Sequence, residues 1–252
     1  MKASGTVEKA LDVLFHLHEA AQPRGVTAIA HSLGLAKSSV HRLLAALGQR
    51  GLVEQDAQDR YRLGIGLVAL GLGLLEREPV VLAARPILER AAKELGETLF
   101  LTAAREGEVT VLDKVEGPGF LRAAPRIGEK VPLHATAVGR LHLAFAPDFV
   151  ALPEGPLQSF TPRTRTQRSA VLQEVARARR RGWAENREEW IPGLVVVASP
   201  VLADGRLVAT LALAAPTVRL AARESGRVAK RLLAAAGEIA DRLQGRSEGR
   251  TA

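Results

Sequence analysis

Apolar side chains between residues 26 and 50 follow the spacing of two short helices. Residues 26–33 predict the first helix, with Thr27 as its N-cap and Gly34 as a left-handed stop. The second helix is predicted to begin near Lys37, because its apolar residues recur at intervals of three and four. These residues are Val40, Leu43, Leu44 and Leu47. Two helices joined by a tight glycine turn form a helix-turn-helix, the DNA-reading motif of many small domains.

Two short stretches, 52–54 and 61–63, flank the polar loop 55–60. We expect them to form the two strands of a wing beside the helix pair, so that residues 1–64 make a winged helix-turn-helix domain. Short polar and basic side chains remain on the outer surface, where they can contact phosphates and base edges. The expected DNA-contacting residues are Thr27, Lys37, Ser38, Ser39, His41, Arg42 and Arg60.

The distribution of charge favours DNA over two alternatives, a helix pair that merely packs and a winged helix that binds only protein. Residues 20–53 contain no Asp or Glu, but they include Arg24, Lys37, Arg42 and Arg50. An ordinary exposed face mixes both signs of charge, whereas a surface that meets phosphates lacks acids. The net charge of +8 is weaker evidence, because the excess of basic residues is spread along the whole chain.

The segments on either side of this region predict a first helix and a linker. Residues 6–20 form an amphipathic pattern, with Val7, Ala10, Leu11, Leu14 and Leu17 expected on the buried face. Residues 63–75 are apolar on nearly all sides and contain four glycines, whose spacing matches neither a dinucleotide-binding loop nor a P-loop. We therefore interpret residues 65–78 as a linker helix and a contact between two copies of the chain.

Residues 79–252 predict a second domain of the α+β class. Pro79 begins a helix that ends at Gly96, and from Thr98 the apolar period changes to two. The strands are expected at 98–105, 108–115, 194–203 and 206–215, the last two joined by a turn at Asp204 and Gly205. Helices are expected at 136–145, 166–181 and 224–243. Antiparallel hairpins interleaved with helices favour helices packed on one antiparallel sheet.

Composition excludes several classes of function. The chain has no cysteine, and its six histidines form no metal-binding motif, so we expect neither a metal site nor a cofactor. The longest apolar run is too short to span a bilayer and the N-terminus has no signal-peptide pattern, which favours a cytoplasmic protein that does not bind membranes. The basic run at 177–181 ends a predicted helix, where cations complement the helix dipole, so we interpret it as a solvated terminus.

The alternative function is an enzyme of the hydrolase type with an accessory winged helix. It would use Glu188 with Glu189, or His134 with Thr136. Adjacent carboxylates on an extended segment point to opposite faces, and the histidine lacks a nearby orienting acid. There is also no GxSxG motif, so binding is favoured over catalysis.

Taken together, the motifs resemble the IclR family of bacterial transcriptional regulators over nearly the whole chain. The similarity lies in "VEKALDVLFHL", "GLAKSSVHRLLAALGQRGLVEQD" and "YRLGIGLVALG", and later in "VPLHATAVGRLHLAF", "RGWAENREEWIPGLVVVASPV" and "GRLVATLALAAP". The resemblance implies a winged helix, a linker helix and a C-terminal GAF-like effector domain. It also implies a homodimer or homotetramer that binds a pseudo-palindromic operator in double-stranded DNA, with an affinity set by a small organic effector.

The resemblance also implies where the effector binds. Carried over position by position, the effector-binding residues are Thr136, Ala137, Val138, Asn186, Val196, Ala212 and Ala214. Free N–H groups at a helix N-terminus attract a carboxylate, which supports the first three. The family often has an acid where Asn186 stands, a cysteine near Val196, and small hydroxyl residues near Ala212 and Ala214. These departures favour a carboxylate with a more apolar body than the smallest acids.

Overall fold

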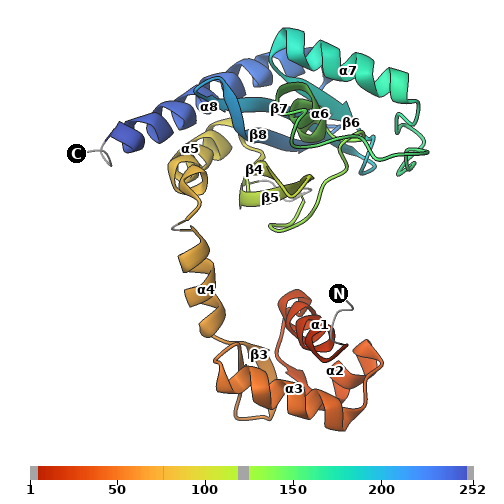
Figure 1. The fold of residues 1–252 in the computed structure, drawn as a ribbon, viewed down its shortest axis with the longest axis vertical. Coiled ribbons are helices and arrows are strands. Elements are labelled where there is room, and N and C mark those ends of the chain that lie inside the picture. Colours follow the sequence, from red (N-terminus) through yellow and green to blue (C-terminus); the bar gives the residue numbers. More distant parts are fainter. Residues whose placement is uncertain (1–4, 76, 119–124, 249–252) are drawn as a thin grey trace. The chain divides into compact units, whose positions relative to one another are not determined.

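The computed structural model describes residues 5–75, 77–118 and 125–248, and the chain divides into two compact units (Figure 1). The units are Met1–Arg77 and Glu78–Ala252. Residues 1–4 of the predicted DNA-binding domain, Glu76 of the predicted linker and residues 249–252 of the predicted effector domain lie outside the described residues.

The first unit is a winged helix-turn-helix, as the sequence predicts. Its elements are α1 (Gly5–Glu19), β1 (Arg24–Gly25), α2 (Val26–Leu33), α3 (Lys37–Gln49), β2 (Val53–Gln55), β3 (Arg60–Leu63) and α4 (Gly66–Leu75). The strands form an antiparallel sheet in the order β1-β3-β2. Gly34 ends α2 in the left-handed conformation at φ 63°, which turns the chain into α3.

The buried face of α1 differs from the prediction. Val13 and Leu17 are buried against the α2–α3 pair, but Val7 and Leu11 are 58% and 48% exposed. The prediction was therefore wrong for Val7 and Leu11. Only one narrow side of the helix meets the small core, so the next residues around the helix stay outside.

Two of the glycines between residues 63 and 75 are required by close backbone packing. A Cβ atom on Gly64 would lie 2.3 Å from the carbonyl oxygen of Gly51, and one on Gly66 would lie 2.8 Å from the same atom. The amide of Gly66 also donates to that oxygen at 2.8 Å. Gly64 and Gly66 thus bring the start of α4 against the end of α3, whereas Gly71 and Gly73 have open space around them.

The second unit is a five-stranded antiparallel sheet covered by helices on both faces. The strands are β4 (Thr98–Arg105), β5 (Glu108–Val115), β6 (Ala184–Arg187), β7 (Leu194–Ala203) and β8 (Arg206–Pro216), in the order β5-β4-β8-β7-β6. One face packs against α5 (Pro79–Leu95) and α8 (Ser225–Glu248), which follows the short 3₁₀ helix η1 (Ala222–Glu224). The other face packs against α6 (Ala137–Phe145), and α7 (Arg168–Arg181) lies beside α6 (Figure 1).

The predicted hairpins and helices of this unit are confirmed to within a few residues. Asp204 and Gly205 both have positive φ, 51° and 71°, as the predicted two-residue turn requires. The edge strand β6 was missed, because its four residues are mostly polar and too few to show a period of two. It exists because its backbone pairs with β7, placing Asn186 opposite Val196.

Candidate functional site

The outer face of α3 presents the basic and polar residues that the sequence predicts. Lys37, Ser38, His41 and Arg42 are exposed and Ser39 is half-buried. The opposite face, from Val40 to Leu47, is buried in the core of the first unit. The helix is therefore held by its apolar side, and its polar side is open to a partner.

The N-terminus of α3 is suited to a phosphate group. Ala36 precedes the helix in extended conformation and supplies no side-chain cap, and the first turn contains no acid. Among the described residues, Lys37 and Arg42 have no hydrogen-bond or ion-pair partner. Unsatisfied N–H groups and unpaired cations at one helix end form an anion-binding surface.

Thr27 is exposed, but it does not cap α2 as predicted. Gly25 is the N-cap, in extended conformation, and no side chain caps the helix. The physical reason is β1, in which Gly25 pairs with Arg60 so that the chain turns into the helix directly afterwards. The hydroxyl of Thr27 thus lies in the first turn of α2, where it has no capping role.

In the wing, Arg60 forms an ion pair and a hydrogen bond with residues of its own loop. Its guanidinium lies 3.0 Å from Asp56 and donates to Gln58 at 3.1 Å. Glu54, also in the wing, accepts from the N–H of Ile65 and pairs with Arg62, and these contacts lower its pKa. Both arginines of the wing are therefore paired within it, whereas Lys37 and Arg42 on α3 have no such partner among the described residues.

In the second unit, the predicted effector residues meet where α6 lies on the sheet. Thr136 is the N-cap of α6 and accepts from the N–H of Gly139 at 3.0 Å. Asn186 on β6 accepts from the N–H of Ala137 at 2.8 Å. Two of the N–H groups at this helix end are thus satisfied within the chain. The N–H of Val138 has no acceptor among the described residues.

The apolar members of the set lie in neighbouring rows of the sheet. Val196 pairs with Asn186 on one side and with Ala214 on the other, and Ala212 lies two residues before Ala214. All three apolar residues belong to the buried cluster that also contains Ala137 and Val138. The structure therefore brings the seven predicted residues together, with α6 packed directly on the sheet.

A buried ion pair beside this site was missed by sequence reasoning. Arg140 on α6 pairs with Glu189, and their side chains are only 1% and 4% exposed. Arg140 also donates to the carbonyl oxygens of Glu185 and His134, and Glu189 accepts from Arg165 at 2.5 Å. The sequence feature that could have revealed this pair is an arginine within an otherwise apolar helix face, because a buried charge requires a buried partner.

The residues of the enzyme alternative have structural partners. The ring of His134 lies 2.8 Å from the carbonyl oxygen of Gln158 and stacks on Phe160. Thr136 donates its hydroxyl to the carbonyl oxygen of Pro132. With Glu189 in the ion pair described above, these groups form no base and nucleophile couple.

Comparison with known proteins shows the family to which this chain belongs. The model of the IclR helix-turn-helix domain matches residues 6–57, and the model of the bacterial transcriptional regulator IclR C-terminal domain matches residues 73–241. The chain belongs to the IclR family. As an IclR-family protein, it is a DNA-binding transcriptional regulator and not an enzyme. None of the described helices is long and apolar enough to cross a membrane.

Individual IclR-family proteins match along most of their length. The chain is 33% identical over 220 residues to the HTH-type transcriptional regulator XynR of Escherichia coli K12, covering 85% of this chain and 87% of XynR. It matches the Thermotoga maritima IclR structure with a TM-score of 0.81 and 27% identity, covering 94% and 98% of the two chains. A Microbacterium hydrocarbonoxydans IclR homologue, solved in complex with 4-hydroxybenzoate, has the same fold, with a TM-score of 0.76, 22% identity, and 96% and 100% coverage.

Proposed function

We propose that two copies of this regulator bind a pseudo-palindromic site in double-stranded DNA, and that a small carboxylate with an apolar body controls the affinity. The carboxylate would bind in the second unit, which we propose to be GAF-like. The observation that supports DNA reading most directly is the outer face of α3, with Lys37 and Arg42 exposed and an uncapped helix end beside them.

The partner copy is proposed from α4 and Ile65 just before it, where several apolar side chains are exposed. Ile65, Val68, Leu70, Leu72 and Leu74 are each more than half exposed. So many exposed apolar side chains on one short helix favour contact with the same helix of a second copy. Two reading heads joined in this way require two half-sites related by two-fold symmetry, and two such dimers could form a tetramer.

A footprint of the full chain on its operator should show two protected half-sites related by two-fold symmetry, about one helical turn apart or a multiple of it. Changing Leu70 and Leu72 together to Ser should weaken the dimer, seen as a lower mass in sedimentation, and should lower operator affinity. Changing exposed Leu172 of α7 to Ser is the control and should affect neither. Protection without two-fold symmetry would contradict the proposal.

Lys37 and Arg42 should differ in how they affect DNA binding. Lys37→Ala removes a point charge at the helix end, so it should weaken binding to all sequences about equally and lower the salt dependence of the affinity. Arg42→Ala should cost on the order of 1–3 kcal/mol on the operator and relax the preference at one base pair. Titrations of operator and scrambled DNA at two salt concentrations measure both effects.

The control for this pair is Lys230→Ala, which removes the same charge from an exposed position on α8. It should leave operator affinity unchanged. Equal losses on operator and scrambled DNA for both Lys37→Ala and Arg42→Ala would show that Arg42 contacts only phosphate.

The effector proposal rests on the chemistry around the N-terminus of α6. The N–H of Val138 and the amide of Asn186 are donors to a carboxylate, whereas an acid at position 186 would only accept. Val196, Ala212 and Ala214 supply an apolar wall without hydroxyl groups. The 4-hydroxybenzoate in the Microbacterium complex is an acid of the expected kind, with an anionic end and an aromatic body.

The first turn of α6 packs closely on the sheet, and we propose that the ligand binds there by moving α6. Ala137 and Val138 are fully buried against Val196 and its neighbours, and Asn186 holds the first turn of the helix. Binding would therefore move α6 together with Arg140 and its partner Glu189. This gives the ligand two conformations to distinguish, as any change in affinity requires.

Aromatic and branched acids should change the tryptophan emission of the protein and its operator affinity. Trp183 and Trp190 are the only tryptophans and lie on either side of Asn186, and Trp190 packs against the apolar cluster of the site. Titration of a panel that includes benzoate, 4-hydroxybenzoate, pyruvate and glyoxylate tests this. Trp190→Phe should lose most of the signal, and Trp183→Phe is the matched control.

Two outcomes would contradict the effector proposal. If only pyruvate and glyoxylate act, the apolar wall does not select the ligand. If none of the acids changes emission or DNA affinity, Thr136 and Asn186 are not ligand contacts.

A further inference from the structure

A cavity of about 490 Å³ lies at the outer edge of β6 and is lined mainly by arginine. We call it the arginine cavity. Five arginines and three glutamates line it, which gives two more positive charges than negative ones. The arginines are Arg163, Arg165, Arg177, Arg181 and Arg187.

The arginines reach this cavity from three separate segments. Arg163 and Arg165 precede α7, Arg177 and Arg181 lie one turn apart on α7, and Arg187 is on β6. Each guanidinium is a planar fork of N–H donors that binds oxyanions with two parallel hydrogen bonds. Forks that approach from several directions suit a ligand with several anionic oxygens.

The carboxylates of the cavity already form ion pairs with arginines. Glu189 is shared by Arg165 and the buried Arg140, which does not line the cavity. Glu174 lies 2.9 Å from Arg177, and Glu185 lies 2.5 Å from Arg187. Arg163 pairs with Glu188, which lies outside the lining as Arg140 does, so the local excess of positive charge remains two.

Arg181 is the cation without a carboxylate partner among the described residues. It lies 3.7 Å above the ring of Trp183 and donates to the carbonyl oxygen of that residue at 2.9 Å. Burial lowers the pKa of Arg181, and the neighbouring Arg177 acts in the same direction. A half-buried guanidinium beside other cations is stabilised by an anion.

We propose that the arginine cavity binds a small multivalent oxyanion, of the phosphate or polycarboxylate type, as a second ligand of this regulator. Arg177 and Arg181 belong to the basic helix end that the sequence predicts, and their side chains also line the cavity. The cavity accommodates a small molecule, and its charge selects one with more than a single negative charge.

The position of the cavity provides a connection to the effector site. Along β6, Glu185 and Arg187 lie on the side of the cavity, and Asn186 between them points the other way, to α6. Glu189 likewise joins Arg165 of the cavity to Arg140 of α6. An anion that draws Arg165 away from Glu189 therefore changes the ion pair that holds α6. This coupling rests on the proposed effector site, whereas the binding of the anion does not.

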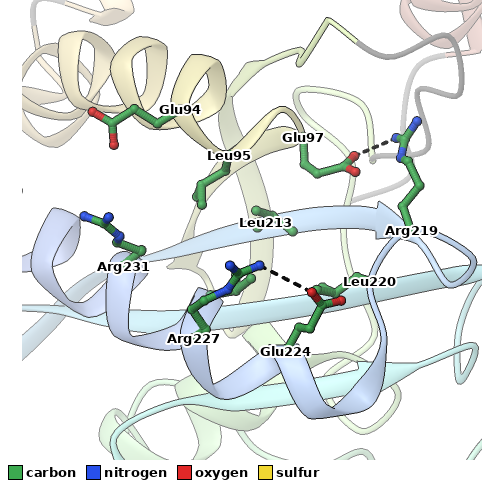
Figure 2. A pocket seen from close by; sticks show the side chains of 10 residues that line it. Glu94, Leu95, Glu97, Leu213, Arg219, Leu220, Glu224, Arg227 and Arg231 are labelled. Carbon is green, nitrogen blue, oxygen red and sulfur yellow. Dashed lines mark hydrogen bonds and ion pairs between the residues drawn. The ribbon is translucent and has the colours of Figure 1, made fainter.

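A larger cavity of the second unit lacks this excess of charge. It has a volume of about 610 Å³, lies between the end of α5 and the start of α8, and includes Leu213 of β8 in its lining (Figure 2). Its three arginines are balanced by three glutamates, and Arg227 lies 3.3 Å from Glu224. Arg227 therefore offers a control for the loss of one arginine from a cavity.

The test is calorimetric titration of the full chain with pyrophosphate and, separately, with citrate, at constant ionic strength and with chloride as the reference anion. One of the two should bind at one site per chain, at least tenfold more tightly than acetate. Arg181→Gln should weaken this binding tenfold or more, and Arg227→Gln should leave it unchanged. Binding of pyrophosphate would indicate a phosphate-type ligand, and binding of citrate would indicate a polycarboxylate.

Two further measurements keep the proposal testable. In a Trp190→Phe background, the anion should change the emission of Trp183, because its ring contacts Arg181. Arg181→Lys retains the charge and should bind with intermediate affinity, which separates a lost contact from a folding defect. Absence of saturable binding by either anion, or equal binding by Arg181→Gln, would overturn the proposal. Because the effector panel contains only monocarboxylates, failure of one proposal is distinguishable from failure of the other.

Discussion

Replacing Glu189 with Ala is expected to lower the free energy of unfolding of the second unit by about 3–5 kcal/mol. The reason is the burial of its partner. Arg140 is 1% exposed, and without Glu189 its charge would remain in the interior with only the carbonyl oxygens of Glu185 and His134. Urea unfolding followed by tryptophan emission measures the effect, since both tryptophans belong to this unit.

The matched control is the neighbouring carboxylate. Glu188 pairs with Arg163, whose side chain is 66% exposed, so Glu188→Ala should cost about 1 kcal/mol or less. Adding Arg140→Met to Glu189→Ala should recover part of the lost stability, because the unpaired charge is then removed. A loss under 1 kcal/mol for Glu189→Ala would mean that water reaches Arg140.

Acidification from pH 7 to pH 5 should destabilise the second unit by about 2 kcal/mol through His142 alone. Burial lowers the pKa of His142 from 6.5 to about 4. In the folded state the ring lies in the interior, 3.4 Å from the hydroxyl of Thr102, which itself contacts Thr210. Between pH 6.5 and 4 the unfolded chain binds a proton at this residue and the folded chain does not.

The sign follows from that difference in bound protons. Proton binding lowers the free energy of the unfolded state as the pH falls below 6.5, so the contribution of His142 to stability is lost progressively down to about pH 4. Comparing urea unfolding at pH 7 and pH 5 for the wild type and for His142→Gln isolates it. The variant should show the smaller difference between the two pH values, and an equal difference would contradict the burial of a neutral ring.

The elements that the sequence predicted well are those in which local chemistry and periodicity agree. The buried face of α3 follows from apolar residues spaced by three and four, from Val40 to Leu47. The β7–β8 hairpin follows from Asp204 and Gly205, because this pair tolerates the positive φ values of a tight turn. Such signals depend on neighbours along the chain and on no distant contact.

The errors occurred where a distant part of the chain determines the local structure. Thr27 lost the capping role because β1 pairs with β3, about 35 residues further along the chain. Val7 and Leu11 are exposed because the core of the first unit is small, a property that no single helix reveals. Strand β6 forms because β7 provides a hydrogen-bonding edge for its polar residues.

By itself, the sequence indicated the class of this protein through its resemblance to the IclR family, and it predicted the helix-turn-helix and the exposed polar side chains of α3. Helix periodicity, turn residues and an acid-free window are properties of short stretches, and physical chemistry assigns them without coordinates. The tertiary structure alone decided which charges meet. It buried Arg140 against Glu189, left Arg181 without a carboxylate partner in the described part of the chain, and gathered arginines from three segments at one edge of the sheet. Electrostatic interactions depend on distance in space and on exclusion of water, and only the folded chain fixes either of them.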